Sequence, residues 1–419
     1  MIERGTITPN FHLRVSLTIV YFLGTWPPVI GKFRLPYLLY TICSFTFILG
    51  ILLSSEIANV LMNWGDMSKL TAVMTLLMTN CTHASKVVVL LRRQARIQTL
   101  LDTADSPAFS RYDKEYEDLI ISYTWKGIFH HAIYQSFGGI AVLCWGFTPI
   151  ADFVAGRSRQ LPMEGWYPYN TTATPAFEIT AAHQGIAIII ACFHNVATDT
   201  LMSGLITVAC CQLAILERNI ISIDNKASIH GMQNDNDKNK PLERKTLAYQ
   251  LLKRCAMHSN MIFHSKYMLM LHHFLGRSKI TEKSQSTRRD CSSLRTLPTE
   301  SRRIVQIHDT IFVLMNVYIP AVLIGMLTYM CCMTYQIFIF CWHGNELHLH
   351  SMRLVTAAYS SNWFSNTERF KRGLQIMMIR AHRPLTLSAG RVMLLSLDTF
   401  MQIMRMSYSI FMVLQGSAA

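Results

Sequence analysis

Long apolar runs separated by short polar segments limit what this chain can fold into. An α-helix needs about 20 predominantly apolar residues to cross a bilayer. Runs of that kind cover residues 35–54, 67–91, 127–151, 179–212, 311–342 and 388–415, and a weaker one covers 255–275. They are long and lack the ten-residue alternation of barrel strands. The sequence therefore predicts an all-α membrane protein with seven transmembrane helices.

Composition and charge agree with a membrane protein. Hydrophobic residues make up 51% of the chain and charged residues only 15%, whereas soluble domains average about 25% charged residues. The net charge of +14 could suggest nucleic acid, but Lys and Arg lie in short blocks between the apolar runs. That pattern is typical of membrane topology, so we expect membrane lipid and no nucleic acid as a partner. We expect no removable signal peptide either.

The basic blocks also predict the orientation. They lie before the first run, between the second and third runs, and after the fourth run. Under the positive-inside rule these segments are cytoplasmic. The N-terminus is then cytoplasmic and, with seven crossings, the C-terminus is extracellular. This orientation is opposite to that of rhodopsin-like receptors, whose Asp-Arg-Tyr and Asn-Pro-x-x-Tyr motifs are also missing from the expected places in this sequence.

Ordered motifs near the C-terminus carry a family resemblance. An apolar run ends at Trp342 and is followed by His343-Gly344-Asn345-Glu346 and a polar segment. The last run contains Ser396-Leu397-Asp398-Thr399-Phe400 and Phe411-Met412-Val413-Leu414. This order resembles the C-terminal signature of insect odorant receptors, a family of ligand-gated cation channels. The loop Leu161-Pro162-Met163-Glu164-Gly165-Trp166-Tyr167-Pro168-Tyr169-Asn170 is similar to that family's second extracellular loop.

The resemblance implies a multi-pass subunit of a non-selective cation channel in the plasma membrane of sensory neurons. Because the chain lacks the long cytoplasmic insertion of the olfactory co-receptor, it resembles a tuned, odorant-binding subunit that forms a heterotetramer with that co-receptor. A gustatory receptor would share the architecture, but Thr399-Phe400 is not followed by that family's Gln-Phe pair. A membrane transporter would show internal repeats, and we find none.

The resemblance also implies a pocket for a small volatile odorant in the outer half of the bundle, between spans two, three, four and six. Apolar and aromatic side chains suit such a pocket. The candidates are Met74, Met78, Phe137, Trp145, His183, Ile186, Met326 and Tyr329. The last helix would line the pore through Met412, Val413, Gln415 and Ser417, with a ring of valines that excludes water. Ordinary packing against lipid or neighbouring helices is the alternative for each apolar residue.

Three polar features lead to separate predictions. A carboxylate within a span is costly in lipid, so Asp199 should face protein or water, and an interhelical hydrogen bond is favoured over a ligand contact. Asn170-Thr171-Thr172 is a glycosylation sequon in an outer loop, which predicts Asn170 as the modified residue. Neither the spacing of His343, His348 and His350 nor that of the 11 Cys residues matches a metal site. We predict no metal, no cofactor and, without a catalytic constellation, no enzyme activity.

A basic segment, 276–303, interrupts the pattern where the fifth and sixth spans should follow each other. Seven crossings would place it outside, against the positive-inside preference. It is either an insertion after a divergent fifth span or an error in the gene model that replaced part of that span, and we favour the error.

Overall fold

The computed structural model describes residues 10–28, 33–64, 67–105, 114–154, 161–232, 240–264, 304–389 and 393–417. These residues are mostly helical, as predicted. The helices are α1 (Phe11–Phe22), α2 (Arg34–Phe45), the π-helix η1 (Thr46–Gly50), α3 (Ile51–Met62), α4 (Met67–Ala104), the 3₁₀ turn η2 (Lys114–Tyr116), α6 (Glu117–Val154), α7 (Ala176–Met232), α8 (Lys240–His264), α10 (Ile304–Ser360), α11 (Glu368–Ala381) and α12 (Leu397–Ser417). Two short strands, β1 (Ser388–Ala389) and β2 (Met393–Leu394), pair antiparallel.

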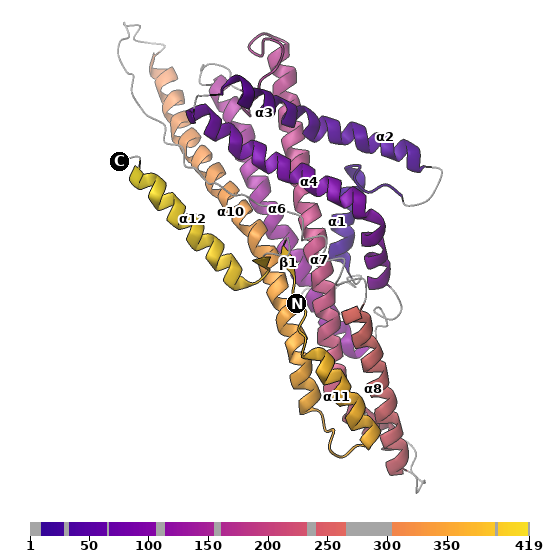
Figure 1. Cartoon of the computed structure of the whole chain (residues 1–419). Coiled ribbons are helices and arrows are strands. Elements are labelled where there is room, and N and C mark those ends of the chain that lie inside the picture. Colours follow the sequence, from indigo (N-terminus) through magenta and orange to yellow (C-terminus); the bar gives the residue numbers. More distant parts are fainter. Residues whose placement is uncertain are drawn as a thin grey trace.

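Helix α7 forms the centre of the bundle, with α6 and α10 packed along it (Figure 1). Its sequence is apolar around most of its circumference, which is typical of a buried helix. Every residue from 196 to 213 is accordingly buried. Helices α2, α3 and α4 lie towards one end of the molecule, and α8 and α11 pack beside α7 and α10 at the other end (Figure 1).

The predicted apolar runs fall on helices where the structure describes them, except for the first residues of the last run, which form the two short strands. Three of the described helical segments are long and apolar enough to cross a membrane: Arg34–Met62, Ala176–Ile229 and Leu323–Ser360. The first joins α2, η1 and α3 into one segment. The number of seven crossings and the orientation of the termini remain predictions.

The sixth span was predicted to end at Trp342, and the helix that carries it, α10, continues through Gly344 to Ser360. A Cβ added at Gly344 would lie 2.5 Å from the backbone oxygen of Leu395. The glycine therefore permits the chain that leads into α12 to cross α10 closely. It does not end the helix.

The last predicted run began too early at residue 388. Ser388 pairs with Leu394 in the two-stranded sheet, and α12 begins only at Leu397. The Ser396 hydroxyl accepts the backbone N–H of Thr399 over 3.2 Å, as serine does at a helix N-cap. The helix therefore begins where this cap lies.

The weak fifth candidate is described only in part. Residues 255–264 belong to α8, while 265–275 and the basic segment 276–303 lie outside the described residues. The choice between an insertion and a gene-model error stays open.

An unpredicted helix, α1, packs against α6 and α7. Leu13 and Val20 are buried in the main core. A Cβ at Gly127 or Gly204 would come within 3 Å of the His12 side chain, so these glycines make room for α1. Its twelve residues are too few to cross a bilayer, which is why a search for spans misses it.

Candidate functional site

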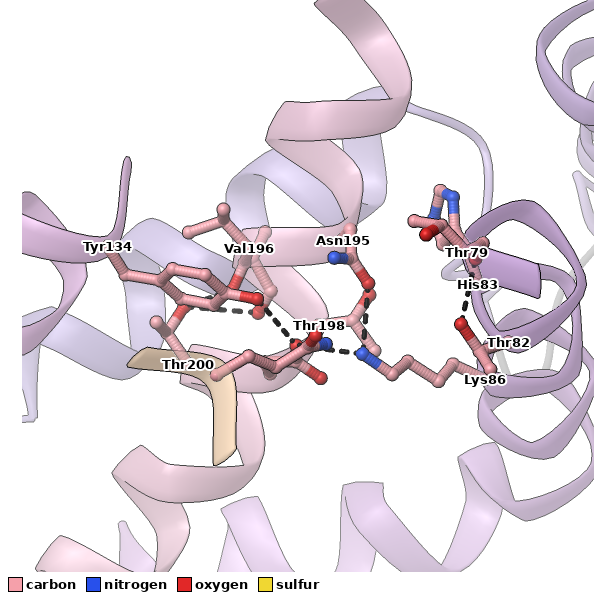
Figure 2. A network of polar contacts seen from close by, with 12 residues as sticks. Thr79, Thr82, His83, Lys86, Tyr134, Asn195, Val196, Thr198 and Thr200 are labelled. Atoms are coloured by element: carbon pink, nitrogen blue, oxygen red, sulfur yellow. Dashed lines mark hydrogen bonds and ion pairs between the residues drawn. The ribbon is translucent and has the colours of Figure 1, made fainter. Parts of the chain in front are cut away.

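Asp199 of α7 is the centre of a buried polar network that joins four helices. Its Oδ2 accepts hydrogen bonds from Lys86 Nζ of α4 over 2.8 Å, from Gln336 Nε2 of α10 over 2.6 Å and from Tyr134 OH of α6 over 3.1 Å. Lys86 also donates to Asn195 Oδ1 over 3.0 Å. Figure 2 shows Lys86 and Tyr134 reaching α7 from opposite sides. The prediction that Asp199 faces protein is confirmed.

The ion pair within this network is well enclosed. Only 3% of the Asp199 side chain and 18% of the Lys86 side chain are exposed. Charges in such a setting are stable only when paired and hydrogen-bonded. The network therefore ties α4, α6 and α10 to α7, since moving any one of these helices removes a partner from a buried carboxylate.

Buried histidines extend the network along α7. His194 Nδ1 lies 2.8 Å from His83 Nε2, and its other ring nitrogen lies 2.6 Å from the Thr25 hydroxyl. Six residues further along α7, the Thr200 hydroxyl lies 2.9 Å from His131 Nδ1 and 3.0 Å from the Ser16 hydroxyl of α1. These contacts fix α1 and the segment after it to the same polar layer.

An aromatic cluster forms where α4, α6 and α10 meet. The rings of Trp145 and Tyr329 lie 5.1 Å apart, and the Tyr329 hydroxyl lies 2.9 Å from that of Thr79. A Cβ at Gly325 would meet Cys144 Cβ at 2.9 Å, so the glycine lets α10 approach α6 here. Two of the predicted pocket residues, Trp145 and Tyr329, are thus in direct contact.

The other predicted pocket residues have different surroundings. Phe137 packs on Tyr335 at 5.9 Å, lower on α10. His183 lies edge-on to Phe47 at 4.7 Å, with its Nε2 3.0 Å from the Phe47 carbonyl oxygen. Met74 packs against a small cluster of Val60, Val73 and Leu77. The side chains of Met78, Ile186 and Met326 are exposed. Their exposure is compatible with a pocket wall or with lipid contact.

Helix α12 lies beside α10 (Figure 1). Phe338 of α10 contacts Phe400 of α12 at 5.5 Å and Trp342 at 5.6 Å. Towards its other end α12 exposes Met412 and Val413, the latter at 68%, and it also carries Gln415 and Ser417. So much exposed apolar surface on one helix requires lipid or another chain to cover it.

Charged contacts join the helices at the opposite end of the molecule from α2 and α3. Asp224 of α7 accepts hydrogen bonds from Arg244 of α8 over 2.7 Å and from Asn362, after α10, over 3.0 Å. Tyr116 of η2 donates to Asn219 of α7, and burial raises the pKa of the Tyr116 hydroxyl. These contacts lie at the end of the bundle that the positive-inside rule predicts to be cytoplasmic.

Membrane-length helices surround a buried ion pair, an aromatic cluster lies above it, and the apolar helix α12 is left exposed beside α10. Within the described ranges, no three His, Cys, Asp or Glu side chains lie close enough to hold a metal ion. The arrangement is that of a multi-pass membrane receptor or channel.

Comparison with known proteins identifies the family. Residues 66–408 match the family model described as 7tm Odorant receptor. The chain therefore belongs to the odorant receptor family and is a receptor rather than an enzyme. It is 23% identical to odorant receptor 46a, isoform A, of Drosophila melanogaster over 94% of each chain. An 86-residue stretch is 34% identical to the odorant receptor coreceptor of Anopheles gambiae and covers 20% of this chain and 18% of that protein.

A solved structure shows the same fold. The olfactory receptor OR5 of Machilis hrabei, in complex with eugenol, superposes with a TM-score of 0.66 at 17% identity, over 97% of this chain and 99% of that one. The matches support the odorant-receptor prediction over the gustatory-receptor-like and transporter alternatives.

Proposed function

We propose that this chain is an odorant-gated, non-selective cation channel subunit that acts with the olfactory co-receptor as a heterotetramer in the plasma membrane. The observation that carries the proposal is the continuity of α10. This one helix bears Tyr329 of the aromatic cluster, Gln336 of the Asp199 network and Phe338, which contacts α12. A ligand that displaces Tyr329 would therefore shift the element that holds α12.

The proposed odorant site is built around Trp145, Tyr329 and Thr79. Two aromatic rings and two hydroxyl groups suit a small volatile molecule with an apolar body and one polar group. The eugenol bound by the similar receptor is a ligand of that size. The remaining candidates lie on α4, α6 and α10 and on the neighbouring α7, and we include them in the proposal: Met74, Met78, Phe137, His183, Ile186 and Met326.

The proposed pore is lined by α12 through Met412, Val413, Gln415 and Ser417. Exposed apolar side chains at Met412 and Val413 support a constriction that excludes water when helices from several subunits meet. With the N-terminus cytoplasmic, the 161–170 loop is extracellular. Asn170 is exposed in this loop, with its Oδ1 accepting the Thr172 N–H, so we include it as the glycosylation site.

Whole-cell recording tests the proposed function. Cells that express this chain with the co-receptor are screened against a panel of volatile molecules. We expect an odorant-evoked cation current that is lost when this chain is omitted. A second version of the chain, whose sequence over residues 265–320 has been verified against the transcript, is recorded in parallel. Silence from both versions would contradict the proposal, whereas current from the verified version alone would identify a gene-model error.

A further inference from the structure

Residues 161–169, here called the outer strap, are fixed to the helix bundle by one buried side chain. Gln184 of α7 is fully buried. Its Oε1 accepts the backbone N–H of Met163 over 3.1 Å, and its Nε2 donates to the Met163 carbonyl oxygen over 3.2 Å and to Tyr167 OH over 2.9 Å. A glutamine amide can make four hydrogen bonds, and three of them hold the strap.

Two further contacts fix the rest of the strap. The backbone N–H of Trp166 donates to the Ser55 carbonyl oxygen of α3 over 3.1 Å. A Cβ at Gly165 would lie 2.9 Å from the Ser55 hydroxyl oxygen, so the strap approaches α3 as closely as glycine allows. Further along, the Tyr169 hydroxyl lies 2.8 Å from that of Thr180 on α7. The outer strap is therefore held by α3 on one side and by α7 on the other.

The strap places one side chain inside the bundle. Met163 is 6% exposed and packs with Leu52 of α3 and Ala187 of α7, against Leu76 of α4. Leu76 lies between the candidate pocket residues Met74 and Met78 in the sequence. Ala187 follows the candidate Ile186 directly and is one helical turn after His183. Met163 thus contacts the helix segments that carry four of the eight predicted pocket residues.

We propose that Met163 is a specificity-determining residue of the odorant site and that Gln184 is the positioning residue that holds it there. The inference rests on the proposed function. Met163 reaches the site around Thr79, Trp145 and Tyr329 from the side of α3, α4 and α7, because it packs against Leu76, which lies about one helical turn before Thr79 on α4. Its flexible thioether limits the length of the ligand. The ligands admitted are small, apolar or aromatic volatile molecules, and their upper length depends on the volume at position 163.

The test is the dose response to a homologous series of straight-chain alcohols, recorded with the co-receptor present. Met163→Ala should move the most potent member of the series towards longer chains. Each additional methylene group that the enlarged site buries should lower its half-maximal concentration about fourfold, from about 0.8 kcal/mol per buried CH₂. Met163→Leu conserves volume and should keep the order of potency. Gln184→Met keeps the size of the side chain but loses the three hydrogen bonds, and it should flatten the discrimination by length.

Surface biotinylation accompanies each recording. If Met163 and Gln184 have a purely structural role, their substitution should lower surface expression or change the potencies of all the alcohols by the same factor. The order of potency within the series would then stay the same. Either that result or an unchanged order of potency in Met163→Ala would overturn the inference, provided that the wild-type chain responds to the alcohols. If Met163→Ala does not reach the surface, Met163→Val replaces it with the same expectation on a smaller scale. A wild-type chain that is silent to every volatile molecule would refute the proposed function, and the inference with it.

Discussion

Asp199 and Lys86 show how the bundle accommodates charge at its centre. One carboxylate oxygen accepts three donors from three helices. The sequence predicted that Asp199 would face protein, because a carboxylate in lipid is costly. Lys86 was missed, although a lysine well inside the run 67–91 is the natural partner for a lone aspartate in another span. The contributions of Tyr134 and Gln336 could not be predicted, since they depend on how the helices cross.

Replacing Asp199 by Asn keeps the shape of the side chain but leaves the Lys86 ammonium buried without its counter-charge. We expect a loss of about 3–5 kcal/mol, the usual effect of breaking a buried ion pair. The measurement is the melting temperature of the detergent-solubilised protein, followed by size-exclusion chromatography. The double variant Asp199→Asn, Lys86→Met should recover part of the loss. If the two substitutions are simply additive, the ion pair is not the source of stability.

Tyr329 makes a hydrogen bond that can be removed without changing the ring. Tyr329→Phe keeps the stacking on Trp145 and loses the contact with Thr79. We expect the half-maximal odorant concentration to change about 2- to 10-fold, from a bond worth about 0.5–1.5 kcal/mol. Tyr359→Phe, at an exposed tyrosine, is the matched control. Equal effects in the two variants would remove Tyr329 from the proposed site.

At the scale of elements, the apolar runs predicted where helices lie but not where they end. Hydropathy falls after Trp342, yet α10 continues to Ser360 because helix formation does not require lipid. The beginning of α12 depends instead on the Ser396 cap and on the preceding strand pair. Trp145 and Tyr329 were predicted together and do meet. The contact of His183 with Phe47 was not foreseen, because the π-helix η1 interrupts the first span and shifts its register.

Replacing Gly344 tests whether the close crossing of α10 and the segment before α12 affects the gating of the channel. Gly344→Ala places a Cβ 2.5 Å from the Leu395 carbonyl oxygen, which must then move. We expect a smaller odorant-evoked current at unchanged surface expression. Gly139→Ala is the control, because a Cβ there meets nothing within 4 Å, and alanine favours the helix by about 1 kcal/mol. Normal currents from Gly344→Ala would show that α12 tolerates the displacement.

At the scale of the whole molecule, composition and the ordered C-terminal motifs were enough to predict the all-α fold class and the family. They could not predict that α1 docks between α6 and α7, since its burial depends on Gly127 and Gly204 in distant helices. Nor could they predict the strap contacts of Gln184, because a glutamine within an apolar run gives no sign of its partners. Helix crossings and side-chain directions are properties of the packed bundle.

In the proposed channel α12 lines the ion pathway, and the permeability of the odorant-evoked current tests this most directly. Val413→Glu is compared with Phe411→Glu. Position 411 lies about 200° away from position 413 around the helix axis, at about 3.6 residues per turn. The reversal potential is measured with sodium inside and calcium outside. We predict that Val413→Glu shifts it to more positive values, because the carboxylates that this chain adds to the pore favour the divalent ion, while Phe411→Glu leaves it near that of the wild type. An unchanged reversal potential in a Val413→Glu channel that still conducts would show that this face of α12 does not line the pore.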